Sequence, residues 1–301
     1  MSDIVLVEAW RFPVKSCAGE QLHGQIEVTP MGIDGDRMFG VLDVDKQRLC
    51  SLKQPAYQPL AAVEARYRQN RLLLSHAALG DLLVDIRTGQ ATHESITVLD
   101  DKVGGVDQGD DAAEYFSRLL DKNCRLVGLP DGHSRSVDPD YRSDEHQTSY
   151  TDGYPLTLHT VASLDAVRKQ LQVPANSDSM PSLNNRQVRS NLIINGEGFQ
   201  EDHLRNIRIG SSALEIGKAC TRCVMTELYV DDAGKVSRSP GTLGALRELG
   251  RYGFAGTNST PKSIFAQNLL VAQPGVIAIG GDVTITHRST DINWQSNQPT
   301  V

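Results

Sequence analysis

Short segments rich in β-branched and aromatic residues recur along this chain, and turns separate them more often than helices do. Strands that follow one another in this way favour antiparallel sheets or barrels over a layout in which strands and helices alternate. In the first half we expect strands at residues 4–11, 26–29, 39–42, 61–67, 71–75, 82–86 and 95–99. In the second half we expect strands at residues 156–158, 192–194, 207–209, 213–216, 224–230, 265–272 and 282–286.

Three segments have the spacing of apolar residues that is typical of an amphipathic helix. The first extends to Leu120 with Asp110 or Asp111 as its expected N-cap, the second begins near Ser163, which we expect to be its N-cap, and the third extends from an expected N-cap at Thr242 through Leu249. The sequence contains no GxGxxG motif and no P-loop, so it lacks the commonest nucleotide-binding signatures. The pattern therefore predicts a mainly β protein of the α+β class with a few helices.

The chain of 301 residues is long for one domain and sufficient for two. Aliphatic residues are scarce between positions 129 and 152, and we interpret this stretch as a mobile connection. The predicted organisation is an N-terminal β domain at 1–128, a linker at 129–152, a second domain at 153–288 and a tail at 289–301. The acidic and histidine side chains of the linker are predicted to be solvated rather than to bind metal: His133, Asp138, Asp140, Asp144, Glu145 and His146.

Composition narrows the choice of partners and compartment. A net charge of −7 and a pI near 5.6 disfavour nucleic acid as a partner. The apolar runs are too short to cross a bilayer, and the first residues do not have the pattern of a secretory signal, so we expect a cytoplasmic protein that does not enter membranes. Five cysteines, an odd number, argue against a disulfide framework and fit a reducing compartment.

Cys220 and Cys223 form the only close cysteine pair in the sequence. A thioredoxin-like pair should open a helix, whereas the residues that follow this pair have the composition of a strand. A structural zinc site needs four ligands, and the other three cysteines stand alone. Two interpretations are left open. In the first interpretation, both cysteines are small buried hydrophobic residues. In the second, the pair supplies a thiolate that binds a soft metal or acts as a nucleophile, and Lys218 and Arg222 stabilise its negative charge.

A set of short motifs, taken in order, resembles the MOSC family of molybdenum-cofactor proteins, which includes the mitochondrial amidoxime-reducing component and its bacterial relatives. The motifs are Pro13-Val14-Lys15-Ser16-Cys17, Asp36-Arg37, Lys53-Gln54-Pro55, Arg189-Ser190-Asn191-Leu192-Ile193 and Ala219-Cys220-Thr221-Arg222-Cys223. The similarity spans nearly the whole chain. It implies an N-terminal MOSC-associated β domain followed by a MOSC β-barrel domain with a few helices.

The resemblance also implies a site. In the family the second cysteine of the pair binds molybdenum, which carries over to Cys223 as metal ligand and catalytic residue, while Cys220 and Cys17 are expected to be structural. The pterin of the cofactor bears a phosphate, which needs cations and amide donors around it. The positions that match the family's cofactor-binding residues are Lys15, Ser16, Arg37, Arg189, Asn191, Thr221, Arg222 and Cys223.

The segment that ends at Asn191 departs from the family pattern Arg-Phe-Arg-Pro-Asn, since it reads Gln187-Val188-Arg189-Ser190-Asn191. Gln187 stands where the family usually has an arginine, and we expect the neighbouring Arg186 to replace the lost cation. Some bacterial relatives carry an additional ferredoxin domain with a cysteine-ligated cluster. No cysteine follows Cys223 here, so no iron–sulfur cluster is expected in this chain, and electrons have to come from a separate protein of the ferredoxin, flavoprotein or cytochrome type.

The activity that the resemblance implies is reduction of small N-hydroxylated compounds, such as amidoximes, hydroxylamines and N-hydroxylated bases. Two other classes of function stay open. In the first, the protein handles sulfur or the molybdenum cofactor, with a persulfide on Cys223. In the second, it binds the cofactor without catalysis.

Overall fold

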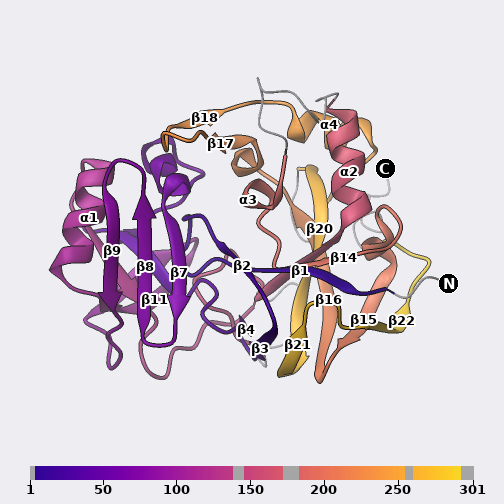
Figure 1. Cartoon of the computed structure of the whole chain (residues 1–301), viewed down its shortest axis with the longest axis horizontal. Helices are drawn as coiled ribbons and strands as arrows, with labels where there is room; N and C mark the ends of the chain where they lie inside the picture. Colours follow the sequence, from indigo (N-terminus) through magenta and orange to yellow (C-terminus); the bar gives the residue numbers. More distant parts are fainter. Residues whose placement is uncertain (1–3, 138–145, 172–182, 255–259, 293–301) are drawn as a thin grey trace.

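The computed structural model describes residues 4–137, 146–171, 183–254 and 260–292, and it shows two lobes that lie side by side (Figure 1). The first lobe holds most of the chain up to residue 128, and the second holds most of the remainder. Strands outnumber helices in both lobes, which confirms the prediction of a mainly β protein with a few helices.

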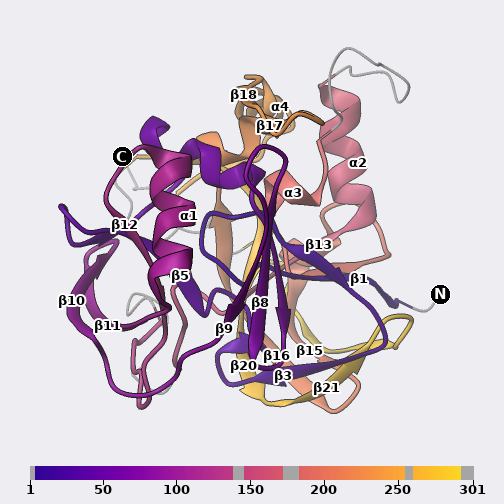
Figure 2. The ribbon, with the colours of Figure 1, turned by 60° about the vertical axis from the view of Figure 1, so that its left-hand side comes forward.

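A small closed barrel forms the centre of the first lobe. Its strands are β5 (Phe39–Asp43), β6 (Arg48–Leu49), β10 (His93–Val98), β11 (Asp101–Asp107) and β12 (Cys124–Gly128). An antiparallel meander lies beside it, made of β7 (Glu64–Arg68), β8 (Arg71–His76) and β9 (Gly80–Asp85). The helix α1 (Asp110–Leu120) lies along the barrel, as Figure 2 shows, and also contacts the 3-10 helix η1 (Pro55–Ala62).

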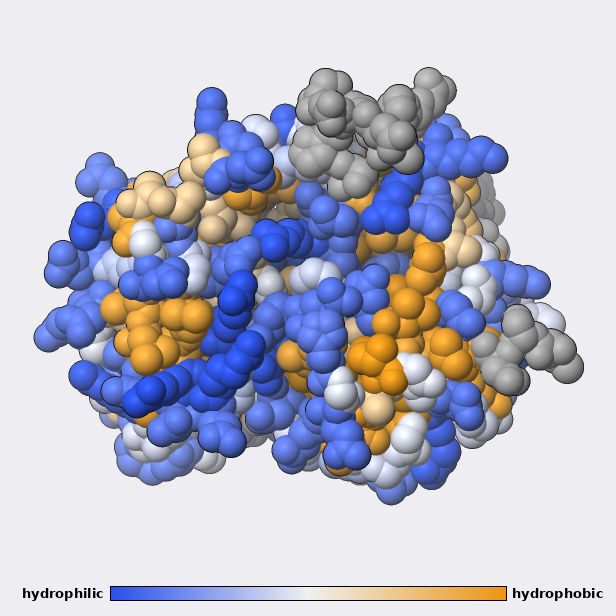
Figure 3. Space-filling view, viewed as in Figure 1, coloured by the Kyte–Doolittle hydropathy of each residue, from blue (hydrophilic) through white to orange (hydrophobic). Residues whose placement is uncertain are grey.

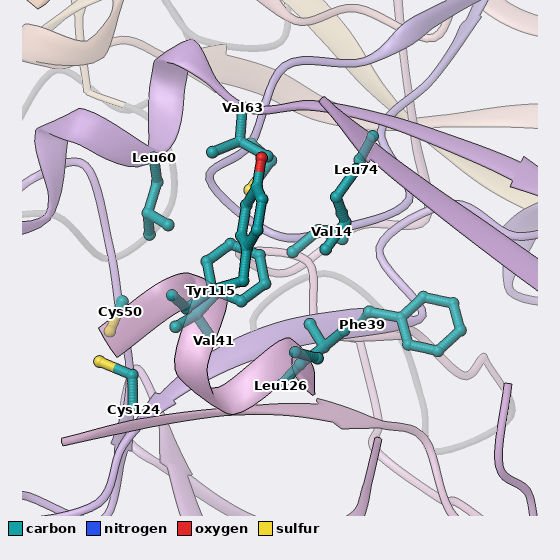
Figure 4. Close-up of a cluster of buried hydrophobic side chains, with 14 of the residues drawn as sticks. Val14, Phe39, Val41, Cys50, Leu60, Val63, Leu74, Tyr115, Cys124 and Leu126 are labelled. Atoms are coloured by element: carbon teal, nitrogen blue, oxygen red, sulfur yellow. The ribbon is translucent and has the colours of Figure 1, made fainter. Parts of the chain in front are cut away.

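One apolar cluster fills the space between barrel, meander and α1 (Figure 4). Val41 and Leu126 come from the barrel, Leu74 comes from β8, and Tyr115 comes from α1. Burial of these side chains removes apolar surface from water and so fixes α1 against the barrel. The helix predicted up to Leu120 is confirmed, but its N-cap is Gly109, and the expected caps Asp110 and Asp111 lie in its first turn.

A nine-stranded sheet forms the second lobe. In spatial order it contains β2 (Glu20–Leu22), β1 (Leu6–Arg11), β14 (Leu192–Ile194), β13 (Leu156–Thr160), β20 (Lys262–Gln273), β16 (Ser212–Thr221), β15 (Leu204–Ile209) and β22 (Val283–Arg288), and β19 (Tyr252–Gly253) pairs with β20. Because β1 pairs antiparallel with β14, the first strand of the chain lies in the sheet of the second lobe. The domain boundary at residue 128 stays a prediction, and the sheet does not follow it.

The remaining elements surround this sheet. A three-stranded sheet contains β3 (Gln25–Thr29), β4 (Gly32–Ile33) and β21 (Gly275–Ala278), and a hairpin contains β17 (Leu228–Val230) and β18 (Val236–Arg238). The helical elements are α2 (Val161–Gln170), α3 (Asn185–Val188), α4 (Thr242–Glu248), η2 (Gln200–His203) and η3 (Val224–Glu227). The hairpin reaches across to η1, so the second half of the chain also packs on the first lobe.

Two local predictions need correction. Residues 224–230 were expected to be one strand, but the segment begins as η3 because the N–H and the hydroxyl of Thr226 both donate to the carbonyl of Cys223. The N-cap of α2 is Thr160 rather than Ser163, and its Oγ1 accepts a hydrogen bond from the Ser163 N–H at 3.1 Å. The helix therefore begins one turn earlier than the apolar spacing indicated.

The expected N-cap of α4 is also wrong. Gly241 occupies that position, and Thr242 is the first residue of the helix, which ends at Glu248.

The mobile connection expected between positions 129 and 152 is wrong for the residues that the structure describes there. The Tyr150 hydroxyl is buried in the barrel and donates to the carbonyl oxygens of Gly104 and Gly128. His133, expected to be solvated, is partly buried with its Nε2 3.0 Å from the carbonyl oxygen of Thr148. The remaining linker and tail positions lie outside the described residues: 138–145, which include Asp138, Asp140, Asp144 and Glu145, and 293–301.

The face shown in Figure 3 separates two kinds of surface. Strongly hydrophilic side chains follow the junction between the lobes, whereas apolar side chains gather over the meander and over the second lobe. The structure contains no helix, within the described ranges, that is long and apolar enough to cross a bilayer. On this face the junction between the lobes is therefore polar, unlike the apolar surfaces on either side of it.

A buried polar network lies where η2 packs against β13 and β20. Arg251 donates to both carboxylate oxygens of Asp202, at 2.6 and 2.9 Å, and Gln267 donates to the same carboxylate at 2.7 Å. The neighbouring Glu201 accepts a hydrogen bond from the Ser163 hydroxyl. Burial, and then the negative charge of Asp202, raise the pKa of Glu201 to about 7.

This raised pKa predicts how stability changes with pH. A carboxyl group whose pKa is higher in the folded than in the unfolded protein stabilises the fold at low pH and loses that contribution as the pH rises to about 7. We therefore compare the free energy of unfolding of Glu201→Gln with that of the wild type. This difference should be about 2 kcal/mol more favourable to the variant at pH 8 than at pH 5. Urea unfolding at the two pH values measures this difference. Glu197→Gln, an exposed position nearby, is the control, and an equal effect of both substitutions would contradict the prediction.

Candidate functional site

A cavity of about 590 Å³ lies at the junction of the lobes. Its walls come from the loops after β1 and β6, the segment that leads into β13, the turn between α3 and β14, and the end of β16 with η3. All eight residues that the sequence singled out line this cavity, although their roles stay a prediction: Lys15, Ser16, Arg37, Arg189, Asn191, Thr221, Arg222 and Cys223.

Three of these residues have left-handed backbone conformations that side chains other than glycine rarely adopt. The φ angles are 74° at Ser16, 49° at Arg37 and 57° at Arg189. The surrounding hydrogen bonds hold them, since the Ser16 hydroxyl donates to the carbonyl oxygen of Cys50 and the Arg189 N–H donates to that of Asn185. Backbone strain of this kind gathers at functional sites, where the fold fixes side chains in directions they would not take alone.

Arg37 and Arg189 lie on the ring of Phe12, each with its guanidinium carbon 4.4 Å from the ring centroid. Arg37 donates to Asn191 Oδ1 and to the carbonyl oxygen of Arg189, both at 3.1 Å, and Arg189 donates to the carbonyl oxygen of Cys17 at 2.7 Å. Asn191 therefore acts in this structure by positioning Arg37. The two guanidinium groups are rigid donors of the kind that bind phosphate.

The charge of this pair is only partly compensated. Arg37 Nη1 donates to Asp36 Oδ2 at 2.6 Å, but burial, and then the nearby Arg37 cation, lower the pKa of Arg189 to about 9. A guanidinium group remains protonated at neutral pH, so the lowered pKa means that Arg189 is held in an environment unfavourable to a cation. An anion in the cavity relieves this penalty.

Lys53 and Asp152 also line the cavity, next to Lys15. Asp152 accepts hydrogen bonds from Lys15 at 2.5 Å and forms an ion pair with Lys53 at 2.9 Å. Burial alone would raise the pKa of Asp152, but the Lys15 and Lys53 cations hold it well below its ordinary value. Sequence reasoning missed both residues as site residues. Lys53 was visible in one of the matched motifs, whereas Asp152 was placed in the linker.

Both cysteines of the pair line the cavity. Cys223 caps η3 and is half-buried, and burial raises the pKa of its thiol, although the Met225 N–H and the Lys53 cation act against that rise. Cys220 packs against the apolar cluster of α2 and α4. Cys220 also lines the cavity, so the roles of the two cysteines stay predictions: a functional thiolate for Cys223 and a structural role for Cys220.

Arg222 provides a direct test of whether an anionic cofactor fits. Its Nε and Nη2 atoms are buried and have no hydrogen-bond partner in the described structure, while its guanidinium lies 5.6 Å from the Phe265 ring centroid. A buried unpartnered donor costs about 1–3 kcal/mol, and more when charged. These donors and a thiol that can bind a soft metal fit a phosphate-bearing molybdenum cofactor.

The expected replacement for the missing family arginine is wrong. The Arg186 side chain lies outside the cavity and donates to Glu64 Oε1 at 2.8 Å. Gln187 itself lines the cavity, where its Oε1 accepts a hydrogen bond from the Asn184 N–H and closes the capping box of α3. The site therefore has no cation in that place, and sequence adjacency could not reveal the opposite directions of the two side chains.

Two family models and several curated relatives match this chain. The MOSC N-terminal beta barrel domain matches residues 4–123, and the MOSC domain matches residues 145–284. Mitochondrial amidoxime-reducing component 1 of Mus musculus is 28% identical over 92% of this chain and 81% of its own length, and that of Homo sapiens is 27% identical over 92% and 82%. A molybdenum cofactor sulfurase of Bombyx mori is 22% identical over 74% of this chain and 28% of its own length.

The names of the first two relatives place them in mitochondria, so the cytoplasmic location stays a prediction.

The five thiols should differ in reactivity. Cys17 is fully buried, and burial raises its pKa to about 12, whereas Cys223 faces the cavity. Because the thiolate is the reactive form, iodoacetamide at pH 8 should label Cys223 at least about tenfold faster than Cys17 in the folded protein. Peptide mass spectrometry after timed labelling measures both rates. In urea, where the chain is unfolded, we expect the two cysteines to be labelled at equal rates. Equal labelling rates in the native protein as well would contradict the placement of Cys223 at the cavity.

Proposed function

Because the chain belongs to the MOSC family, we propose that its cavity binds a molybdenum cofactor and that the protein reduces N-hydroxylated compounds with electrons from a separate protein. The observation that carries the proposal is that Cys223 and a wall of cations line the same cavity. Amidoxime-reducing components are among the relatives of the chain, and their name supports this reaction over the alternatives.

The residues divide into two roles in this proposal. Lys15, Arg37, Arg189 and Arg222 bind the phosphate of the pterin, because these cations line a cavity that has only one carboxylate among its described lining residues. Cys223 binds the metal through its thiolate, which has to lose a proton first. Bound there, the cofactor supplies the two-electron reduction of the substrate N–O bond.

The reaction requires two electrons and two protons. A substrate R–NHOH then gives R–NH₂ and water, as the N–O bond breaks and one N–H bond and one O–H bond form. The electrons come from an electron-transfer protein of the ferredoxin, flavoprotein or cytochrome type. The protein holds the reacting group near Cys223 and keeps Arg37 and Arg189 in fixed positions through Asn191 and Phe12.

The activity itself is tested with benzamidoxime and reduced methyl viologen, using protein from a host that makes the cofactor. We expect turnover by the wild type and loss of both activity and molybdenum in Cys223→Ala. Cys220→Ala is the matched control in the same cavity and should keep most of its molybdenum, because the family resemblance assigns the metal to Cys223 and Cys220 packs against apolar side chains. Wild-type turnover in Cys223→Ala would contradict the ligand role. A persulfide on Cys223 without reduction of substrate would favour the sulfur-handling function that the sulfurase relatives suggest.

Loss of a phosphate-binding cation should reduce cofactor occupancy. Arg189→Ala removes a charged donor, and hydrogen bonds to charged groups contribute about 1.5–3 kcal/mol, so cofactor affinity should fall about 10- to 100-fold. Molybdenum and oxidised pterin per chain are measured after dialysis. Arg186→Ala is the control, because its side chain is exposed and points to Glu64. Equal occupancy in the two variants would show that Arg189 does not bind the cofactor.

A further inference from the structure

The cavity holds more cations than the phosphate of one pterin requires. The chain carries a net charge of −7, yet seven lysine and arginine side chains and a single carboxylate are found among the described residues that line the cavity. Four of the cations are at positions that the family resemblance assigns to the cofactor. The other three, Lys53, Lys218 and Lys262, have no such assignment.

Two of these three lysines are more exposed than the cations assigned to the phosphate. Lys15 is 8% exposed, whereas the Lys53 side chain is 43% exposed and Lys262 is also exposed. Lys218 is half-buried, and its ammonium lies 5.5 Å from the centroid of the Tyr154 ring. A lysine is a compact charge on a flexible stem, so it suits a ligand that arrives and leaves better than a permanently held group.

The same lysines line the cavity together with Cys223, and Lys53 comes from the loop after β6 in the first lobe. Lys218 lies two residues before Cys220 on β16, and Lys262 precedes Ser263, whose carbonyl oxygen accepts a hydrogen bond from the Arg222 N–H at 2.8 Å. A molecule that reacts beside Cys223 therefore lies within reach of cations from both lobes. Walls of low dielectric concentrate the field of such a cluster inside the cavity.

We propose that this enzyme selects N-hydroxylated substrates that carry a phosphate group, and that Lys53, Lys218 and Lys262 bind that phosphate. This proposal rests on the proposed function and specifies its substrate class. Lys53 also contacts Asp152, so the substrate phosphate shares this cation with the carboxylate. The phosphate is not consumed: two electrons and two protons convert the N–OH group to N–H and water, and the phosphate ester leaves unchanged.

The test compares a matched pair of substrates, N6-hydroxyadenosine and its 5′-monophosphate, with the molybdenum-loaded enzyme and reduced methyl viologen. Exposed ion pairs contribute about a threefold effect each, so three lysines should give the monophosphate a kcat/KM at least about tenfold higher, mainly through a lower KM. Because salt screens exposed charges, this preference should weaken as ionic strength rises, while reduction of the nucleoside should not change in parallel.

The lysine variants separate substrate binding from cofactor binding. In the double variant Lys218→Gln with Lys262→Gln, the preference for the monophosphate should fall to about threefold or less through a higher KM. Lys169→Gln, at an exposed position on α2, is the control and should keep the wild-type preference. Molybdenum content is measured in parallel. Loss of molybdenum from the double variant would assign these lysines to the cofactor and overturn the proposal.

The wild-type measurement also distinguishes this proposal from the function on which it rests. Equal kcat/KM values for the nucleoside and the monophosphate, with benzamidoxime reduced normally, would overturn the phosphate selection and leave the reductase intact. Failure to reduce all three compounds by molybdenum-loaded protein would overturn the reductase itself.

Discussion

The antiparallel pairing of β1 with β14 is the constraint on which the site depends. The Trp10 N–H donates to the carbonyl oxygen of Asn191 at 2.8 Å, and the Asn191 side chain donates back to the carbonyl oxygen of Trp10 at 3.2 Å. The chain that leaves β1 must then pass Arg189 at close range, which places Phe12 under two guanidinium groups. Because β1 lies in the sheet of the second lobe, residues more than 170 positions apart in the sequence meet in one wall of the cavity.

Gathering cations in this cavity opposes folding, and the structure shows how that opposition is limited. Arg37 pairs with one carboxylate, that of Asp36, and both Arg37 and Arg189 lie on an aromatic ring. Arg222 has buried donors for which the described residues provide no partner. Burying cations in this way is unfavourable unless other interactions compensate. The large apolar clusters of both lobes provide the stability that such a site needs, and an anionic ligand that neutralises the cations stabilises the folded state further.

The sequence predicted the class of fold and the composition of the site better than it predicted their arrangement. Helix α1 and the strands around residues 64–76 follow local patterns, so their positions were predictable from spacing and turn residues. The part played by Asp152 was not, because its partners Lys15 and Lys53 are distant in sequence and only the fold brings them together. The opposite directions of Arg186 and Gln187 depend on a capping box, which adjacency in the sequence does not reveal.

The central claim is that Cys223 is the protein's ligand to a molybdenum dithiolene cofactor, and X-ray absorption at the molybdenum edge tests it most directly. Two sulfur atoms come from the cofactor and one from Cys223, so the wild-type protein should show about three sulfur neighbours per molybdenum at bonding distance. Replacement of Cys223 by serine should leave about two wherever metal is retained. Three sulfur neighbours in that variant, or wild-type protein from a cofactor-producing host with neither molybdenum nor pterin, would contradict the account.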